Sequence, residues 1–109
     1  MSSRKRYKVK YDQHHILYNK GEFFLIPIDI FDYDLKPKDL AVYMVLSRYS
    51  DSNGECYPSR DTIAENINVS VDTVDSALKQ LKSAGVVEVT PQFADGAQIT
   101  NRYRLIRSL

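Results

Sequence analysis

Cationic and hydrogen-bonding side chains stand close together near the C-terminal end of the sequence. Arg102 and Arg104 alternate with Tyr103 and Leu105, so in a β-strand the two arginines share one face and the apolar pair shares the other. A guanidinium group can donate paired hydrogen bonds to a phosphate or to the edge of a base. The chemistry that this spacing indicates is the binding of a polyanion.

Bond-breaking chemistry has little support in the sequence. Cys56 is the single cysteine and has no histidine near it, His14 and His15 are adjacent, and there is no glycine-rich phosphate loop. We therefore expect no enzymatic activity, no bound metal and no cofactor. Since neither a secretion signal nor an apolar stretch of membrane-spanning length is present, the lone cysteine predicts a cytoplasmic chain without a membrane partner.

The net charge of +1 conceals an uneven distribution. Residues 1–10 hold five Lys or Arg and no acid, whereas residues 51–75 hold six acids and only Arg60 as a cation. From Lys79 onward, cations again outnumber acids. A chain that binds a polyanion presents its positive surfaces to it. The charges therefore place the expected binding surface at the two ends of the chain.

Three helices are predicted in the middle of the chain. Pro37 suits the first position of a helix, whose broad apolar face continues to about Tyr49. Ser59 is a suitable N-terminal cap for a second helix and Ser70 for a third, which Gly85 ends. The second and third helices are thus separated by only a tight turn.

β-Structure is predicted on both sides of these helices. Residues 11–30 are rich in aromatic and β-branched side chains, which predicts a hairpin or two extended segments, with Pro27 at an edge position. After the helices, residues 86–89 and 99–106 predict two strands whose connection turns at Asp95-Gly96.

This order of elements is the layout of a winged helix-turn-helix. We expect an α+β fold with three helices, a C-terminal β-hairpin wing and an N-terminal β segment. Residues 1–10 are expected to be a flexible basic tail, and residues 11–109 a single domain.

Several short motifs carry a resemblance to one group of such domains. They are Phe23-Phe24-Leu25-Ile26-Pro27, Leu40-Ala41-Val42-Tyr43, Gly54 with Cys56-Tyr57-Pro58-Ser59-Arg60, Val69-Ser70 with Thr73-Val74, Ala77-Leu78 and Leu81, and Gly96 with Gln98, Asn101 and Tyr103. Over residues 23–106 the chain resembles the winged helix-turn-helix domains of replication initiators and related mobile-element proteins of Gram-positive bacteria. Since the sequence ends soon after the wing, we expect a standalone accessory protein of plasmid replication, partition or conjugative transfer. Within that group it is similar to the transfer-origin-binding TcpK proteins.

The predicted third helix departs from this group in its charge. In DNA-reading relatives, the positions that match Val71, Asp72, Asp75 and Ser76 commonly carry Arg, Lys or Gln. Two interpretations of the acids stay open: a carboxylate accepts a hydrogen bond from cytosine, or Asp72 stabilises the helix N-terminus while Asp75 is solvated. Both weaken the case for this helix as the main reader of a DNA sequence.

The sequence therefore predicts a sequence-preferring protein of plasmid or mobile-element DNA processing that binds double-stranded DNA mainly through its basic wing and termini. The resemblance implies a phosphate contact for Arg60. The candidate DNA-binding residues are Arg60, Thr73, Ser76, Lys79, Gln98, Thr100, Asn101, Arg102 and Arg104.

Partners other than DNA are predicted as well. Apolar and aromatic residues of the N-terminal region predict a homodimer, which suits repeated DNA half-sites; they are Tyr11, Ile16, Leu17, Tyr18, Phe23 and Phe24. One alternative function is a protein-interaction domain that docks a relaxase or a replication protein through its acidic third helix. Another is a transcriptional repressor.

Overall fold

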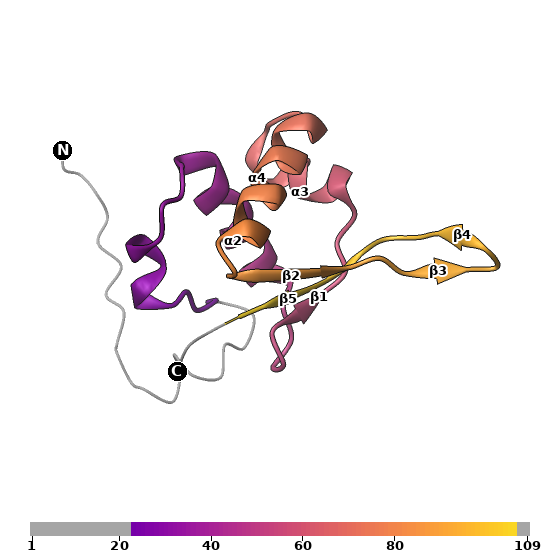
Figure 1. Cartoon of the computed structure of the whole chain (residues 1–109), viewed down its shortest axis with the longest axis horizontal. Coiled ribbons are helices and arrows are strands. Elements are labelled where there is room, and N and C mark those ends of the chain that lie inside the picture. The colour runs from indigo at the N-terminus through magenta and orange to yellow at the C-terminus, as the bar shows by residue number, and fades with distance from the viewer. Residues whose placement is uncertain (1–22, 107–109) are drawn as a thin grey trace.

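The structure, a computed structural model, describes residues 23–106 of the 109-residue chain. A group of three α-helices packs beside a small antiparallel sheet, and a hairpin projects from that sheet (Figure 1). The helical elements are the 3-10 helix η1 (Ile28–Asp32) and the α-helices α2 (Pro37–Tyr49), α3 (Arg60–Ile67) and α4 (Val71–Ser83). The strands are β1 (Glu55–Cys56), β2 (Val87–Thr90), β3 (Phe93–Ala94), β4 (Ala97–Gln98) and β5 (Arg102–Leu105).

Helix α2 begins and ends where its sequence predicts. Pro37 occupies the first helical position, and Asp39, which is fully buried, accepts a hydrogen bond from the backbone N–H of Lys36 at 2.8 Å. That bond satisfies one of the donors that a helix start leaves without a partner. Lys38 Nζ lies 2.9 Å from the same carboxylate, so the buried charge is paired.

Helices α3 and α4 are capped by the predicted serines. Ser59 Oγ accepts from the N–H of Thr62 at 3.0 Å, and Ser70 Oγ accepts from the N–H of Thr73 at 3.1 Å. Between the helices Asn68 adopts the left-handed conformation with φ 57°, which asparagine tolerates better than most residues. The short turn fixes α4 across α3, and the two helices form a helix-turn-helix.

The wing is built on a three-stranded sheet in the order β1-β5-β2, with β5 in the centre and all pairs antiparallel. Beyond it, β3 and β4 form a two-stranded hairpin that turns at Asp95 and Gly96, with φ 53° and 81°. Positive φ at both central residues suits the twist of a tight hairpin. The hairpin extends away from the helices (Figure 1). These observations confirm the predicted α+β winged helix-turn-helix.

The core fills the space between the helices and the inner face of the sheet. Tyr43 and Leu46 of α2, Ile63 of α3, Leu81 of α4 and Tyr103 of β5 are each at most 1% exposed. Side chains from all three α-helices and from the sheet thus meet in a single cluster, which fixes the angle between α4 and the wing.

The extended structure expected over residues 11–30 needs correction in its described part. Residues 11–22 lie outside the described residues, residues 23–27 pair with no described strand, and Ile28–Asp32 is η1 rather than strand. The reason is local: the carbonyl of Pro27 accepts the N–H of Ile30 at 3.2 Å, which turns the chain back on itself.

The β-structure around the wing also differs in detail from the prediction. The second wing strand, expected over residues 99–106, begins earlier as β4 and is interrupted at residues 99–101 before β5. Strand β1 was not predicted. It has only two residues, and its pairing of Cys56 with Tyr103 depends on a partner 47 residues further along the chain.

Candidate nucleic-acid interface

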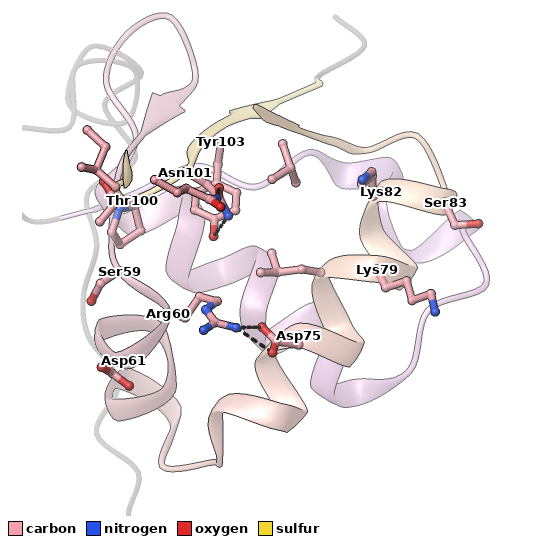
Figure 2. Close-up of a pocket in the computed structure, with 15 residues that line it drawn as sticks. Ser59, Arg60, Asp61, Asp75, Lys79, Lys82, Ser83, Thr100, Asn101 and Tyr103 are labelled. Atoms are coloured by element: carbon pink, nitrogen blue, oxygen red, sulfur yellow. Dashed lines mark hydrogen bonds and ion pairs between the residues drawn. The ribbon is translucent and has the colours of Figure 1, made fainter. Parts of the chain in front are cut away.

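A groove of about 1020 Å³ lies between α4, the start of α3 and the base of the wing. Its helical side is formed by Arg60, Asp75, Lys79 and Lys82, and its wing side by residues 98–101. Figure 2 labels Arg60, Asp75, Lys79 and Lys82 on the helical side and Thr100 and Asn101 on the wing side. In a winged helix-turn-helix the second helix of the motif is the one that enters the major groove, so this groove adjoins the expected reading surface.

Helix α4 presents two lysines to the groove. Its buried stripe consists of Val74, Ala77, Leu78 and Leu81, which pack into the core. Lys79 and Lys82 fall on the exposed side, and within residues 23–106 neither forms an ion pair. Their charges are therefore available to an anionic ligand.

Arg60 and Asp75 join α3 to α4 at the centre of this helical side. Arg60 donates from Nη1 to both carboxylate oxygens of Asp75, at 2.9 and 2.8 Å, and the two side chains point toward one another (Figure 2). The hydrogen bond and the charge of Asp75 raise the pKa of Arg60 above its ordinary value. Both side chains are about half exposed, so the pair adds little to stability and mainly fixes the guanidinium in one place.

The wing side of the groove holds a chain of amide groups. Gln98 Nε2 donates to Asn101 Oδ1 at 3.1 Å, and Asn101 Nδ2 donates to the hydroxyl of Tyr103 at 3.3 Å. Tyr103 is fully buried, and this burial raises the pKa of its hydroxyl. A buried neutral phenol therefore orients two amides that retain further donors and acceptors for a ligand.

Of the nine predicted site residues, five line the groove. They are Arg60, Lys79, Gln98, Thr100 and Asn101. Two others lie elsewhere on α4: the Thr73 backbone N–H and hydroxyl both bond to Ser70, and the Ser76 hydroxyl lies 3.2 Å from Lys38 Nζ on the side of α2. Contact of any of these residues with DNA stays a prediction.

Arg102 and Arg104 lie on the other face of the sheet. They alternate along β5 with the buried Tyr103 and Leu105, so they point away from the core. Arg104 bonds to Glu88 through two nitrogens, each at 3.0 Å, and Arg102 Nη1 lies 3.9 Å from Glu55. The two arginines that the spacing singled out share a face, as predicted, but it is not the face that lines the groove.

Lys82 lines the groove although it was not among the predicted site residues. The spacing of residues 75, 79 and 82 is that of one helical face and could have identified it. The pairing of Asp75 with Arg60 had no comparable signal, because the two residues lie 15 positions apart on different helices.

Comparison with protein families matches residues 33–87, just over half of the chain, to a family described as a helix-turn-helix domain. The chain belongs to this helix-turn-helix family. Such a domain indicates DNA binding. A solved structure, titled as a possible transcriptional regulator from Methanosarcina mazei Go1, is similar with a TM-score of 0.53 and 20% sequence identity. The similarity covers 67% of this chain and 57% of that one, and at this identity it concerns the fold alone.

No curated protein matches the chain. In the described part of this helix-turn-helix protein, residues 23–106, no helix combines the length and apolarity needed to span a membrane. The same residues contain no cluster of three or more His, Cys, Asp or Glu arranged to hold a metal ion.

Proposed function

We propose that this helix-turn-helix protein binds double-stranded DNA with a sequence preference, through the groove between α4 and the wing. The observation that carries the proposal is the meeting of Arg60, Lys79 and Lys82 with the oriented amides of Gln98 and Asn101 in that groove. Cations bind phosphates with little regard to sequence, whereas amides and guanidinium groups read base edges. The groove offers both kinds of contact.

In this mode the lysines of the groove, rather than the wing arginines, are the main phosphate contacts. Arg102 and Arg104 are paired with acids on the far face of the sheet, and releasing them for phosphates means breaking those ion pairs. Residues 90–101 of the wing contain Asp95 and no Lys or Arg. Within residues 23–106, Lys79 and Lys82 form no ion pair with an acid, so a phosphate can bind them without displacing one.

We place this activity in the processing of plasmid or mobile-element DNA, as an accessory protein of conjugative transfer or replication. The support is the resemblance of residues 23–106 to the domains of that group. The role is non-enzymatic, the active form is a homodimer, and a relaxase or a replication protein is the partner that such a role requires. A DNA-binding protein with a single, buried thiol also fits a reducing cytoplasm.

A transcriptional regulator is the second candidate, since the solved structure of similar fold is titled as a possible one. The docking of a basic partner protein on α4 has less support. Arg60 compensates the charge of Asp75, which leaves Asp72 as the one exposed acid of that helix that forms no ion pair within residues 23–106. One exposed carboxylate is a weak surface for a basic partner.

The salt dependence of binding to a fluorescent random-sequence duplex tests the proposal with the full chain. Each phosphate that the protein neutralises adds about 0.9 to the slope of log affinity against log salt. We expect Lys79→Ala combined with Lys82→Ala to lower that slope by about two, and Arg102→Ala combined with Arg104→Ala to lower it by less than about one.

Arg48→Ala is the matched control. Arg48 is exposed on α2, outside the groove lining, and donates to Asn66 at 2.7 Å. Its loss should leave the slope unchanged. A wild-type chain that binds duplex DNA without salt dependence, or not at all, contradicts the proposed function. If the double arginine variant lowers the salt slope more than the double lysine variant does, the chain binds DNA mainly through its wing.

A further inference from the structure

The ion pair of Arg60 and Asp75 lies in the groove lining, beside the part of α4 that is expected to enter the major groove. In a helix-turn-helix, the first helix of the motif crosses the DNA backbone and the second lies in the major groove. Arg60 belongs to the first of these helices, but its hydrogen bonds carry its guanidinium over the second. The charge therefore lies where base edges are expected rather than at the rim of the interface.

Only one nitrogen of the Arg60 guanidinium donates to Asp75, which leaves the other two to bind a ligand. Both hydrogen bonds to Asp75 come from Nη1. The opposite edge, formed by Nε and Nη2, carries three N–H groups that have no hydrogen-bond partner within residues 23–106. Two parallel donors on a planar edge match two adjacent acceptors.

Guanine is the base that presents two adjacent acceptors in the major groove, N7 and O6. Adenine offers one acceptor and one donor there, so the second N–H of the arginine edge would meet another donor. A phosphate also accepts two hydrogen bonds, but a phosphate at this place would approach the carboxylate of Asp75 and be repelled by it.

We propose that Arg60 reads a guanine in the major groove and that Asp75 is the positioning residue that aims it. The inference rests on the proposed function, whose binding site it makes more specific. Asp75 holds the guanidinium in one orientation before DNA arrives, so less conformational freedom is lost on binding. Lys79 and Lys82 supply phosphate contacts on the same surface. Asp75, although it is an acid on the helix expected in the major groove, then favours DNA binding because it positions Arg60.

The test is selection of binding sites by the full chain from a random duplex library, followed by replacement of each selected guanine with 7-deazaguanine. That analogue lacks the N7 acceptor and leaves Watson–Crick pairing intact. We expect one guanine whose replacement lowers the wild-type affinity about tenfold, as for loss of a good arginine–guanine contact. Arg60→Gln should bind the two duplexes with about equal affinity.

Asp75→Asn separates positioning from simple structural support. The amide keeps a single acceptor oxygen, so the arginine loses its fixed orientation and the guanine preference should fall several-fold. Removal of a negative charge should at the same time raise affinity for unrelated duplexes. A defect in folding alone would lower both affinities, and melting curves of the variants monitor it. Arg48→Ala should leave selection unchanged.

Three results overturn the inference while leaving the proposed function intact. They are a selected site with no guanine sensitive to 7-deaza replacement, an Arg60→Gln variant that loses affinity equally for all sequences with a smaller salt slope, and an Asp75→Asn variant with an unchanged guanine preference. The second of these outcomes identifies Arg60 as a phosphate contact. Absence of salt-dependent duplex binding, by contrast, removes the proposed function itself.

Discussion

Charge compensation within the groove decides what α4 would offer to DNA in the proposed binding mode. Arg60, Lys79 and Lys82 line the groove together with Asp61 and Asp75, so the cations exceed the acids there by one. Because Asp75 is held against Arg60, its charge acts mainly on that guanidinium and on groups beside it, and less on phosphates that approach Lys79 and Lys82. A helix that carries two acids can in this way belong to a DNA-binding surface.

The same pair marks the limit of prediction at the scale of single residues. The sequence left Asp75 either solvated or in contact with a base. Its actual partner comes from another helix, so no local pattern reveals it. Lys79, Gln98, Thr100 and Asn101 were predicted as site residues and lie together in the groove. Helical spacing indicates Lys79, and nearness to the Asp95-Gly96 turn of the wing indicates the other three; both are local properties of the sequence.

Burial of Cys56 gives the chain a dependence of stability on alkaline pH. Cys56 is 2% exposed, and this burial raises the pKa of its thiol from 9.0 to about 11. The unfolded chain ionises first, so the contribution of the neutral thiol is complete below pH 9 and is lost as the pH rises toward 11. We expect the free energy of unfolding to fall by about 1 kcal/mol from this group between pH 8 and 10.

Urea denaturation at the two pH values measures this loss. Cys56→Ala is the control: it should be less stable at both pH values, because it leaves a cavity, but its loss between them should be smaller by about 1 kcal/mol. Parallel losses for the two proteins mean that other groups account for the pH dependence.

At the scale of elements, the helices could be predicted because their ends carry their own signals. Pro37, Ser59, Ser70 and Gly85 lie at the helix boundaries of the structure, and each acts through its nearest neighbours. Strand β1 has no such signal, since it becomes a strand only by pairing with β5. Helix η1 was hidden by an apolar sequence that fits a strand equally well.

The turn before β1 leaves little room for an added side chain. Gly54 has φ 78°, its carbonyl accepts the N–H of Leu105 at 2.8 Å, and a Cβ placed there would lie 3.2 Å from the Leu105 oxygen. Gly54→Ala therefore combines a left-handed conformation with a close contact. We expect a loss of about 2 kcal/mol or more in the free energy of unfolding, measured by urea denaturation.

Gly96→Ala separates these two effects. Gly96 has nearly the same φ, 81°, but a Cβ added there meets no atom within 4 Å. Its substitution should cost about 1 kcal/mol, from the backbone conformation alone. Equal losses at the two glycines show that the contact with β5 is unimportant, and that the turn does not hold β1 against the sheet.

At the scale of the whole molecule, apolar surface gathers at the end of the domain that precedes α2. Ile28 is 93% exposed and Phe31 77% exposed, and Phe23 and Phe24 are each more than one third exposed. We call these four residues the N-terminal patch. Exposed apolar groups so close together in sequence are unusual on a monomer and typical of a contact surface. The patch extends the region for which the sequence predicted a homodimer.

We predict that the full chain is a homodimer through the N-terminal patch, a symmetric arrangement that matches two DNA half-sites. Light scattering at about tens of micromolar should give twice the chain mass, since a weak dimer still assembles there. Ile28→Asp combined with Phe31→Asp should give a folded monomer that melts at the same temperature as the wild-type chain diluted below its dimer dissociation constant, because both side chains are exposed in the single chain. Phe93→Asp is the matched control: Phe93 is 66% exposed but lies on the wing hairpin, so its substitution should leave the dimer intact. A wild-type monomer at this concentration excludes the dimer, and dissociation by Phe93→Asp instead moves the contact to the wing.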